Sequence, residues 1–103
     1  MEQIERITRM EACLDASEQA IRELSEALSA FEGIQNQFRK LSDYYGSDFW
    51  MRDYEDDEAG KLPKDLKRGV LSEDAVYDLI TENRELLVRM LRLVTSALET
   101  DGL

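Results

Sequence analysis

The stretch YYGSDFWMRDYEDDEAGKLPKDLKRGVLSED, residues 44–74, decides how this chain folds. It contains the only Trp, the only Pro, three of the four Tyr and three of the five Gly, whereas the flanking sequence has the apolar spacing of amphipathic helices. Because Gly and Pro interrupt helices, the breaks between helical segments must lie within this stretch. The sequence therefore predicts two long helices joined by a connecting segment.

One long helix is predicted over about 2–45, before and into this stretch. Its apolar side chains recur once per heptad in two series that together form the stripe of a coiled coil. From Ile34 onward the apolar side chains move around the helix, which favours either a change of partner or a bend near Gly33. A continuous helix is the preferred interpretation. The two series are Ile7, Leu14, Ile21 and Leu28, and Met10, Leu24, Phe31, Phe38 and Tyr45, with Ser17 as the polar member of the second.

Short helical pieces are predicted in the connecting segment. Gly46 suits the end of the first helix, and Ser47 suits the N-cap of a second helix over about 48–59. Gly60 and the following Pro end that helix. One further helical turn is expected over about 63–68.

The last helix is predicted over about 73–100, with Ser72 at its start. Leu71 and Val76 stand at the positions of a hydrophobic staple around that start. The chain is therefore expected to be a single all-α domain over 1–103. We expect a long antiparallel helical hairpin, coiled-coil-like, with one or two short helices in the connecting segment. Two long helices alone leave apolar surface uncovered, so a homodimer is also expected.

Composition excludes several classes of function. The net charge of −10 opposes general binding to nucleic acid or to anionic membranes, because both rely on basic side chains. The absence of His removes the usual general base and zinc ligand, and a single Cys excludes an intrachain disulfide. Neither a signal peptide nor a membrane span is recognisable, so a cytoplasmic protein is expected. We expect no enzyme, catalytic residue, cofactor or bound metal.

The acidic run Asp53–Glu58 is the one feature that raises a metal hypothesis. Its spacing fails the EF-hand pattern, because the loop position that needs Gly is Glu58 and the one that needs Glu is Lys64. Around a helix these carboxylates cannot all face one ion. A solvated acidic face is therefore the preferred interpretation, with a loose Mg²⁺ or Ca²⁺ site as the alternative.

Aromatic and basic side chains mark a possible partner-binding surface in the connecting segment. Most of the aromatic side chains are expected to pack as the core of this segment, while one or two rings stay exposed as in an interaction hot spot. The basic side chains answer the acidic run or steer a partner. The candidate residues are Tyr45, Trp50, Arg52, Tyr54, Lys61, Lys64, Lys67 and Arg68.

Several runs resemble a known family. They are YYGSDFW-x3-YE-x2-EAGKLPKDLKRGVLSEDAVYDLI, NRELL just after it, and RITRMEACLDA near the start. With these runs the chain resembles a bacterial domain-of-unknown-function family, number 4298. The resemblance implies a small, stand-alone, helical cytoplasmic protein. It supplies no activity and no catalytic residue.

Three functions remain as hypotheses. The preferred one is a non-enzymatic protein–protein interaction or adaptor module that forms a homodimer and binds an unknown protein partner. The second is an acidic regulator that binds a basic protein or mimics nucleic acid. The third is a carboxylate-dependent protein that binds a metal or small molecule through the acidic run.

Overall fold

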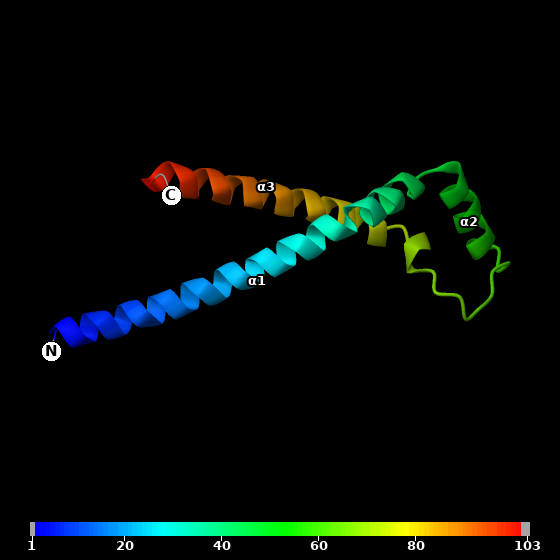
Figure 1. The fold of residues 1–103 in the computed structure, drawn as a ribbon. Helices are drawn as coiled ribbons and strands as arrows, with labels where there is room; N and C mark the ends of the chain where they lie inside the picture. Colours follow the sequence, from blue (N-terminus) through cyan, green and yellow to red (C-terminus); the bar gives the residue numbers. More distant parts are fainter. Residues whose placement is uncertain (1, 102–103) are drawn as a thin grey trace. The chain divides into compact units, whose positions relative to one another are not determined.

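The computed structural model describes residues 2–101 and confirms the all-α prediction. It contains a long helix α1 (Glu2–Tyr44), a short helix α2 (Asp48–Glu58), a 3-10 turn η1 (Gly69–Leu71) and a long helix α3 (Ala75–Asp101), shown in Figure 1. Within this part of the chain there is no strand. The short elements α2 and η1 both lie in the segment that joins the long helices, as the sequence predicts.

The chain divides into two compact units, and the boundary lies inside α1, between Phe38 and Arg39. Helix α1 runs without interruption through Gly33, in agreement with the preferred interpretation of the sequence. As far as the chain is described, the first unit is a single helix. Its apolar side chains therefore have no packing partner within their own unit. The antiparallel packing of the long helices and the single domain remain predictions.

The second unit begins with the last residues of α1 and a sharp break. Gly46 has a φ of 81°, a left-handed conformation that favours Gly at the end of a helix. Ser47 then accepts a hydrogen bond through its hydroxyl from the backbone N–H of Trp50 at 3.2 Å. The predicted end of the first helix and the predicted N-cap of α2 are both confirmed.

Helix α2 ends in a Schellman motif centred on Gly60, whose φ is 72°. The N–H of Gly60 donates to the carbonyl of Asp57 at 3.0 Å, and that of Lys61 donates to the carbonyl of Asp56 at 2.9 Å. These bonds satisfy carbonyl groups that the helix itself leaves open. The motif stops α2 before Pro63 is reached.

The turn expected at 63–68 is shorter in the structure, and the next helical element comes later. One hydrogen bond, from the N–H of Leu66 to the carbonyl of Pro63 at 3.2 Å, closes a single turn. The 3-10 turn η1 follows at Gly69–Leu71, so Gly69 begins a helical element and does not close one. The physical reason lies in Arg68, whose carbonyl accepts from the N–H of Leu71 at 3.0 Å while its side chain is held by α2.

Helix α3 begins at Ala75, slightly later than the expected start near residue 73. Ser72 still acts at this start, because its hydroxyl accepts from the N–H of Ala75 at 3.1 Å. The element η1 lies against both α2 and α3. Among the described residues the buried apolar side chains are Trp50, Leu71 and Val76, so the core of the second unit sits where these three elements meet.

Candidate functional site in the connecting segment

Three aromatic rings form the centre of the connecting segment, and we call Tyr45, Trp50 and Tyr54 the aromatic cluster. The ring of Tyr45 meets that of Trp50 edge to face, with centroids 5.2 Å apart and planes at 69°. The ring of Tyr54 stacks on that of Trp50, with centroids 5.2 Å apart and planes at 19°. Both geometries are favourable for aromatic pairs. Trp50 therefore lies between two rings, and only 8% of its surface is exposed to solvent.

Hydrogen bonds tie the aromatic cluster to the start of α3. The indole Nε1–H of Trp50 donates to the carbonyl of Val70 at 3.0 Å. The hydroxyl of Tyr45 donates to the backbone carbonyl of Glu73 at 3.0 Å, and that of Tyr54 donates to Oε1 of Glu73 at 2.9 Å. The bond to Glu73, followed by the charge of this carboxylate, raises the pKa of Tyr54. These three bonds fix the path of the chain between η1 and α3.

A fourth tyrosine bond links the end of α1 to α2. The hydroxyl of Tyr44 donates to Oδ2 of Asp53 at 2.6 Å. Burial raises the pKa of Tyr44 to about 12, with further contributions from the hydrogen bond and the charge of Asp53. The tyrosine stays protonated at neutral pH and serves as a hydrogen-bond donor, because an ionised hydroxyl beside a carboxylate is disfavoured.

The acidic run on α2 is partly matched by the basic side chains that follow it. Arg68 donates through Nη1 to Oδ1 of Asp57 at 2.7 Å, and its second nitrogen donates to the carbonyl of Lys64 at 3.4 Å. The Nζ of Lys61 lies 3.9 Å from Oδ1 of Asp56. The intramolecular interpretation of the basic side chains is therefore correct for Arg68 and Lys61. Arg68, with its direct hydrogen bond, is the stronger of the two.

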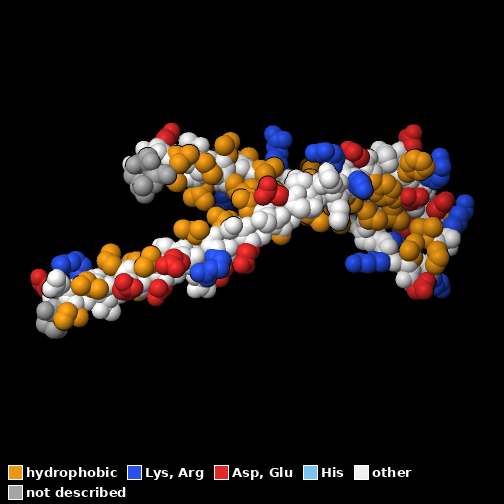
Figure 2. Space-filling view, in the orientation of Figure 1, with side chains coloured by type: hydrophobic (Ala, Val, Ile, Leu, Met, Phe, Trp, Pro, Cys, Tyr) orange, Lys and Arg blue, Asp and Glu red, His pale blue; other side chains and the backbone are white. Residues whose placement is uncertain are grey.

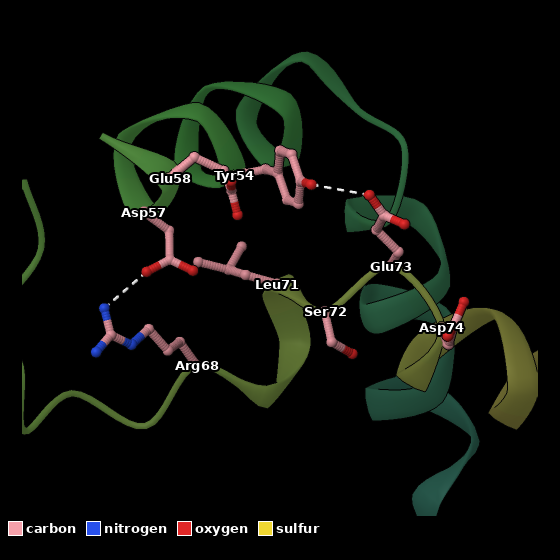
Figure 3. A pocket seen from close by; sticks show the side chains of 8 residues that line it. All are labelled: Tyr54, Asp57, Glu58, Arg68, Leu71, Ser72, Glu73 and Asp74. Carbon is pink, nitrogen blue, oxygen red and sulfur yellow. Dashed lines mark hydrogen bonds and ion pairs between the residues drawn. The ribbon is translucent and has the colours of Figure 1, made fainter. Parts of the chain in front are cut away.

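An open hollow of about 540 Å³ lies beside the aromatic cluster (Figure 3). The side chains of α2 line one wall, while η1 and the approach to α3 line the other. Four carboxylates border it, but one is held by Arg68 and another accepts from Tyr54. Such a hollow suits a cationic side chain better than an anion. Its lining residues are Tyr54, Asp57, Glu58, Arg68, Leu71, Ser72, Glu73 and Asp74.

The carboxylates of this region are spread over several roles. Within residues 2–100, the structure brings no three Cys, Asp or Glu side chains together in a way that could hold a metal ion. Asp53, Asp56 and Asp57 each contact a different partner.

The predicted partner-binding residues fall into two groups. Trp50 is buried and is not available at the surface of a single chain, so the expectation that it contacts a partner directly needs correction. Tyr45, Tyr54 and Arg68 are half-buried and hold the segment together. The residues that remain exposed are Arg52, Lys61, Lys64 and Lys67.

Phe49 is an exposed ring of the connecting segment, although it was not among the predicted partner-binding residues. It is 69% exposed, and the guanidinium carbon of Arg52 lies 5.9 Å from its centroid. Its place directly before Trp50 could have shown this, because neighbouring residues on a helix point to different sides. The sequence does not indicate that the backbone carbonyls of Val70 and Glu73 act as hydrogen-bond acceptors.

The long helices present a second kind of surface. Large apolar side chains are exposed along α1 and α3, as Figure 2 shows in orange. Ile21 on α1 is 68% exposed, although it belongs to the predicted stripe, and Leu91 on α3 is 67% exposed. Cys13 on α1 is exposed as well.

The search for helices that could cross a membrane found none of sufficient length and apolarity within the described part of the chain. The family model described as Domain of unknown function (DUF4298) matches residues 7–93, and the chain belongs to this family. No curated protein and no solved structure matches the chain.

Proposed function

We propose that this DUF4298 protein is a non-enzymatic helical interaction module that associates with itself and binds a protein partner. One observation carries the proposal: among the described residues three apolar side chains are buried, whereas long apolar rows on α1 and α3 are exposed. Apolar patches of this extent on a soluble chain mark interaction surfaces.

The energetics of the first unit support self-association. A single helix gains little from its own backbone in water, and most helical stability comes from packing of an apolar face. Burial of apolar surface stabilises by about 25 cal/mol per Å². A row of Ile and Leu side chains therefore favours any arrangement that covers it.

The side chains of the second unit support an assignment without catalysis. The groups that could best take part in a reaction are the tyrosine hydroxyls and the paired carboxylates that hydrogen bonds join. They are used as hydrogen-bond partners within the connecting segment. These hydrogen bonds fix the connecting segment and so position the side chains on its surface. Phe49 and Arg52, with the exposed lysines Lys61, Lys64 and Lys67, then form the face offered to a protein partner.

Sedimentation equilibrium of the full chain tests the proposal. The expected result is a mass well above the 11.9 kDa of one chain, retained at high salt because apolar contacts hold the assembly. Leu24→Glu places a charge in the exposed row of α1 and should lower the mass to that of one chain. Gln19→Glu adds the same charge on the opposite side of the helix and should leave the mass unchanged. A wild-type chain that is monomeric and captures no protein from a cell extract would exclude this function.

A second candidate is an acidic regulator, and the carboxylate-lined hollow beside Tyr54 favours it. The net charge of −10 on this chain would attract a basic partner over a distance that depends on the ionic strength. Capture of a basic protein at low salt that is lost at high salt would support this candidate. Capture that persists at high salt supports the apolar interaction module.

A further inference from the structure

The first unit carries an apolar row with regular heptad spacing. Its side chains occupy positions a and d of successive heptads along α1. The large ones before Phe31 are exposed to between 45% at Leu28 and 68% at Ile21. Position a is filled by Ile7, Leu14, Ile21 and Leu28, and position d by Met10, Ser17, Leu24 and Phe31.

We infer that this row binds the same row of a second copy of the chain, in a parallel and in-register two-stranded coiled coil. The inference rests on the proposed self-association and adds its geometry. Four heptads are enough to sustain a coiled coil. Ile at position a together with Leu at position d favours two strands, and Ile21 and Leu24 supply this combination in the middle of the row.

The charges beside the row distinguish a parallel pair from an antiparallel one. Position e holds Glu11, Glu18 and Glu32, whereas position g holds Arg6 and otherwise small uncharged side chains. In a parallel coiled coil each g side chain faces an e side chain of the partner. Arg6 then meets the partner's Glu11, once on each side of the dimer.

An antiparallel pair brings the same positions into conflict. There, position e faces position e, so the row of glutamates would lie opposite an identical row. Like charges placed in this way destabilise an interface. The parallel arrangement separates these glutamates and supplies two attractive pairs.

The ion pair and the hydrogen bond between side chains of the first unit lie on the side away from the row. Glu5 and Arg9 form an ion pair of 3.8 Å, and Gln19 donates to Glu23 at 3.0 Å. These residues occupy positions c and f, which face solvent in a coiled coil. Their contacts thus leave the apolar row and its flanking charges available to a partner.

The lengths of the helices also favour a second copy as the occupant. Helix α1 has 43 residues and α3 has 27, so α1 is longer by about 24 Å at about 1.5 Å per residue. One α3 is therefore too short to cover the whole of α1, whereas a second α1 matches its full length and its heptad register.

Disulfide trapping in the full chain tests the geometry. In a Cys13→Ser background, Met10→Cys and Leu24→Cys each place one thiol at position d. In an in-register parallel dimer both variants should form disulfide-linked dimers in a glutathione redox buffer, which run at about twice 11.9 kDa without reductant. Ala12→Cys, at the outward position f, is the matched control and should stay as a single chain.

The outcomes separate this inference from the proposed function. Efficient cross-linking of both position-d variants supports the parallel register. An antiparallel dimer can place at most one of the two positions opposite itself, so cross-linking only in a mixture of Met10→Cys and Leu24→Cys chains overturns the inference and leaves self-association intact. A dimer without cross-links, or one joined through α3 or by a different protein, also overturns it. A monomeric chain overturns both the inference and the proposed self-association.

Discussion

Replacement of Trp50 is the sharpest test of how the connecting segment is held together. Trp50→Phe keeps one aromatic ring between Tyr45 and Tyr54 but removes the indole N–H that donates to Val70 at 3.0 Å. The lost hydrogen bond costs about 1 kcal/mol, and the smaller ring weakens two aromatic pairs by a further ~1 kcal/mol. The expected loss is therefore about 2 kcal/mol. Trp50→Ala also leaves a cavity and should cost about 4 kcal/mol.

Hydrogen exchange measured by mass spectrometry reads this loss locally, in peptides that cover residues 44–80. A loss of about 2 kcal/mol accelerates exchange about 30-fold where exchange proceeds through opening of the second unit. Peptides from the first unit should exchange as in the wild type, because Trp50 belongs to the second unit.

Phe49→Ala is the matched control, since Phe49 precedes Trp50 on α2 but is 69% exposed. Its effect should stay within about 0.5 kcal/mol. If Trp50→Phe exchanged as slowly as the wild type, the indole hydrogen bond would have no role in the stability of the segment. If Phe49→Ala cost as much as Trp50→Ala, burial would not explain the difference between the two rings.

Three further predictions follow from the turns, the tyrosines and the ion pairs of the second unit. Gly60→Ala should destabilise the protein by about 1 kcal/mol in urea unfolding, because the φ of 72° is unfavourable for Ala; the space beside Gly60 is open, so no steric clash adds to this cost. Gly33→Ala, inside a helix and also in open space, should stabilise the protein by about 1 kcal/mol. Equal effects of the two changes would refute the conformational explanation. Tyr44 has its pKa raised from 10.0 to about 12, so the stability that it contributes is complete below pH 10 and is lost as the pH rises through about 12. Absorbance titration should show a last tyrosinate step near this pH that is missing in Tyr44→Phe, and an unchanged titration in this variant would contradict the assignment. Arg68→Ala should lower the free energy of unfolding in urea by about 1 kcal/mol, and by less at high salt, because the ion pair with Asp57 that it loses is only partly exposed. Lys67→Ala, at an exposed position, should have no measurable effect. Equal losses in the two variants would argue against the ion pair.

The helical elements could be predicted from the sequence because their signals are local. Apolar spacing marked α1 and α3, and the break between α1 and α2 followed from Gly46 and Ser47, whose roles depend on their own backbone conformation and side chain. The turn at 63–68 was less predictable. Its outcome depends on Arg68, which reaches back to Asp57 on α2, and no local rule specifies a contact of that kind.

The candidate site was predicted in its residue types but not in its contacts. An aromatic cluster could be expected from the density of rings in the connecting segment. Burial of Trp50, by contrast, requires the carbonyl of Val70 to lie within reach of the indole, and backbone groups carry no identity in a sequence. For the same reason, two tyrosines that converge on Glu73 could not be inferred from their spacing.

The two units depend on different kinds of interaction, and this difference bears on how the protein works. The connecting segment is held by bonds within one chain, from the aromatic cluster to Arg68, so its stability does not depend on protein concentration. Under the proposed self-association, the helix of the first unit gains its stability by association, which follows mass action. The connecting segment can then keep its surface fixed at any concentration, while assembly through α1 would determine how many copies of that surface a partner meets. Two copies joined by α1 would raise the affinity for a partner with repeated sites without any change in the contact itself.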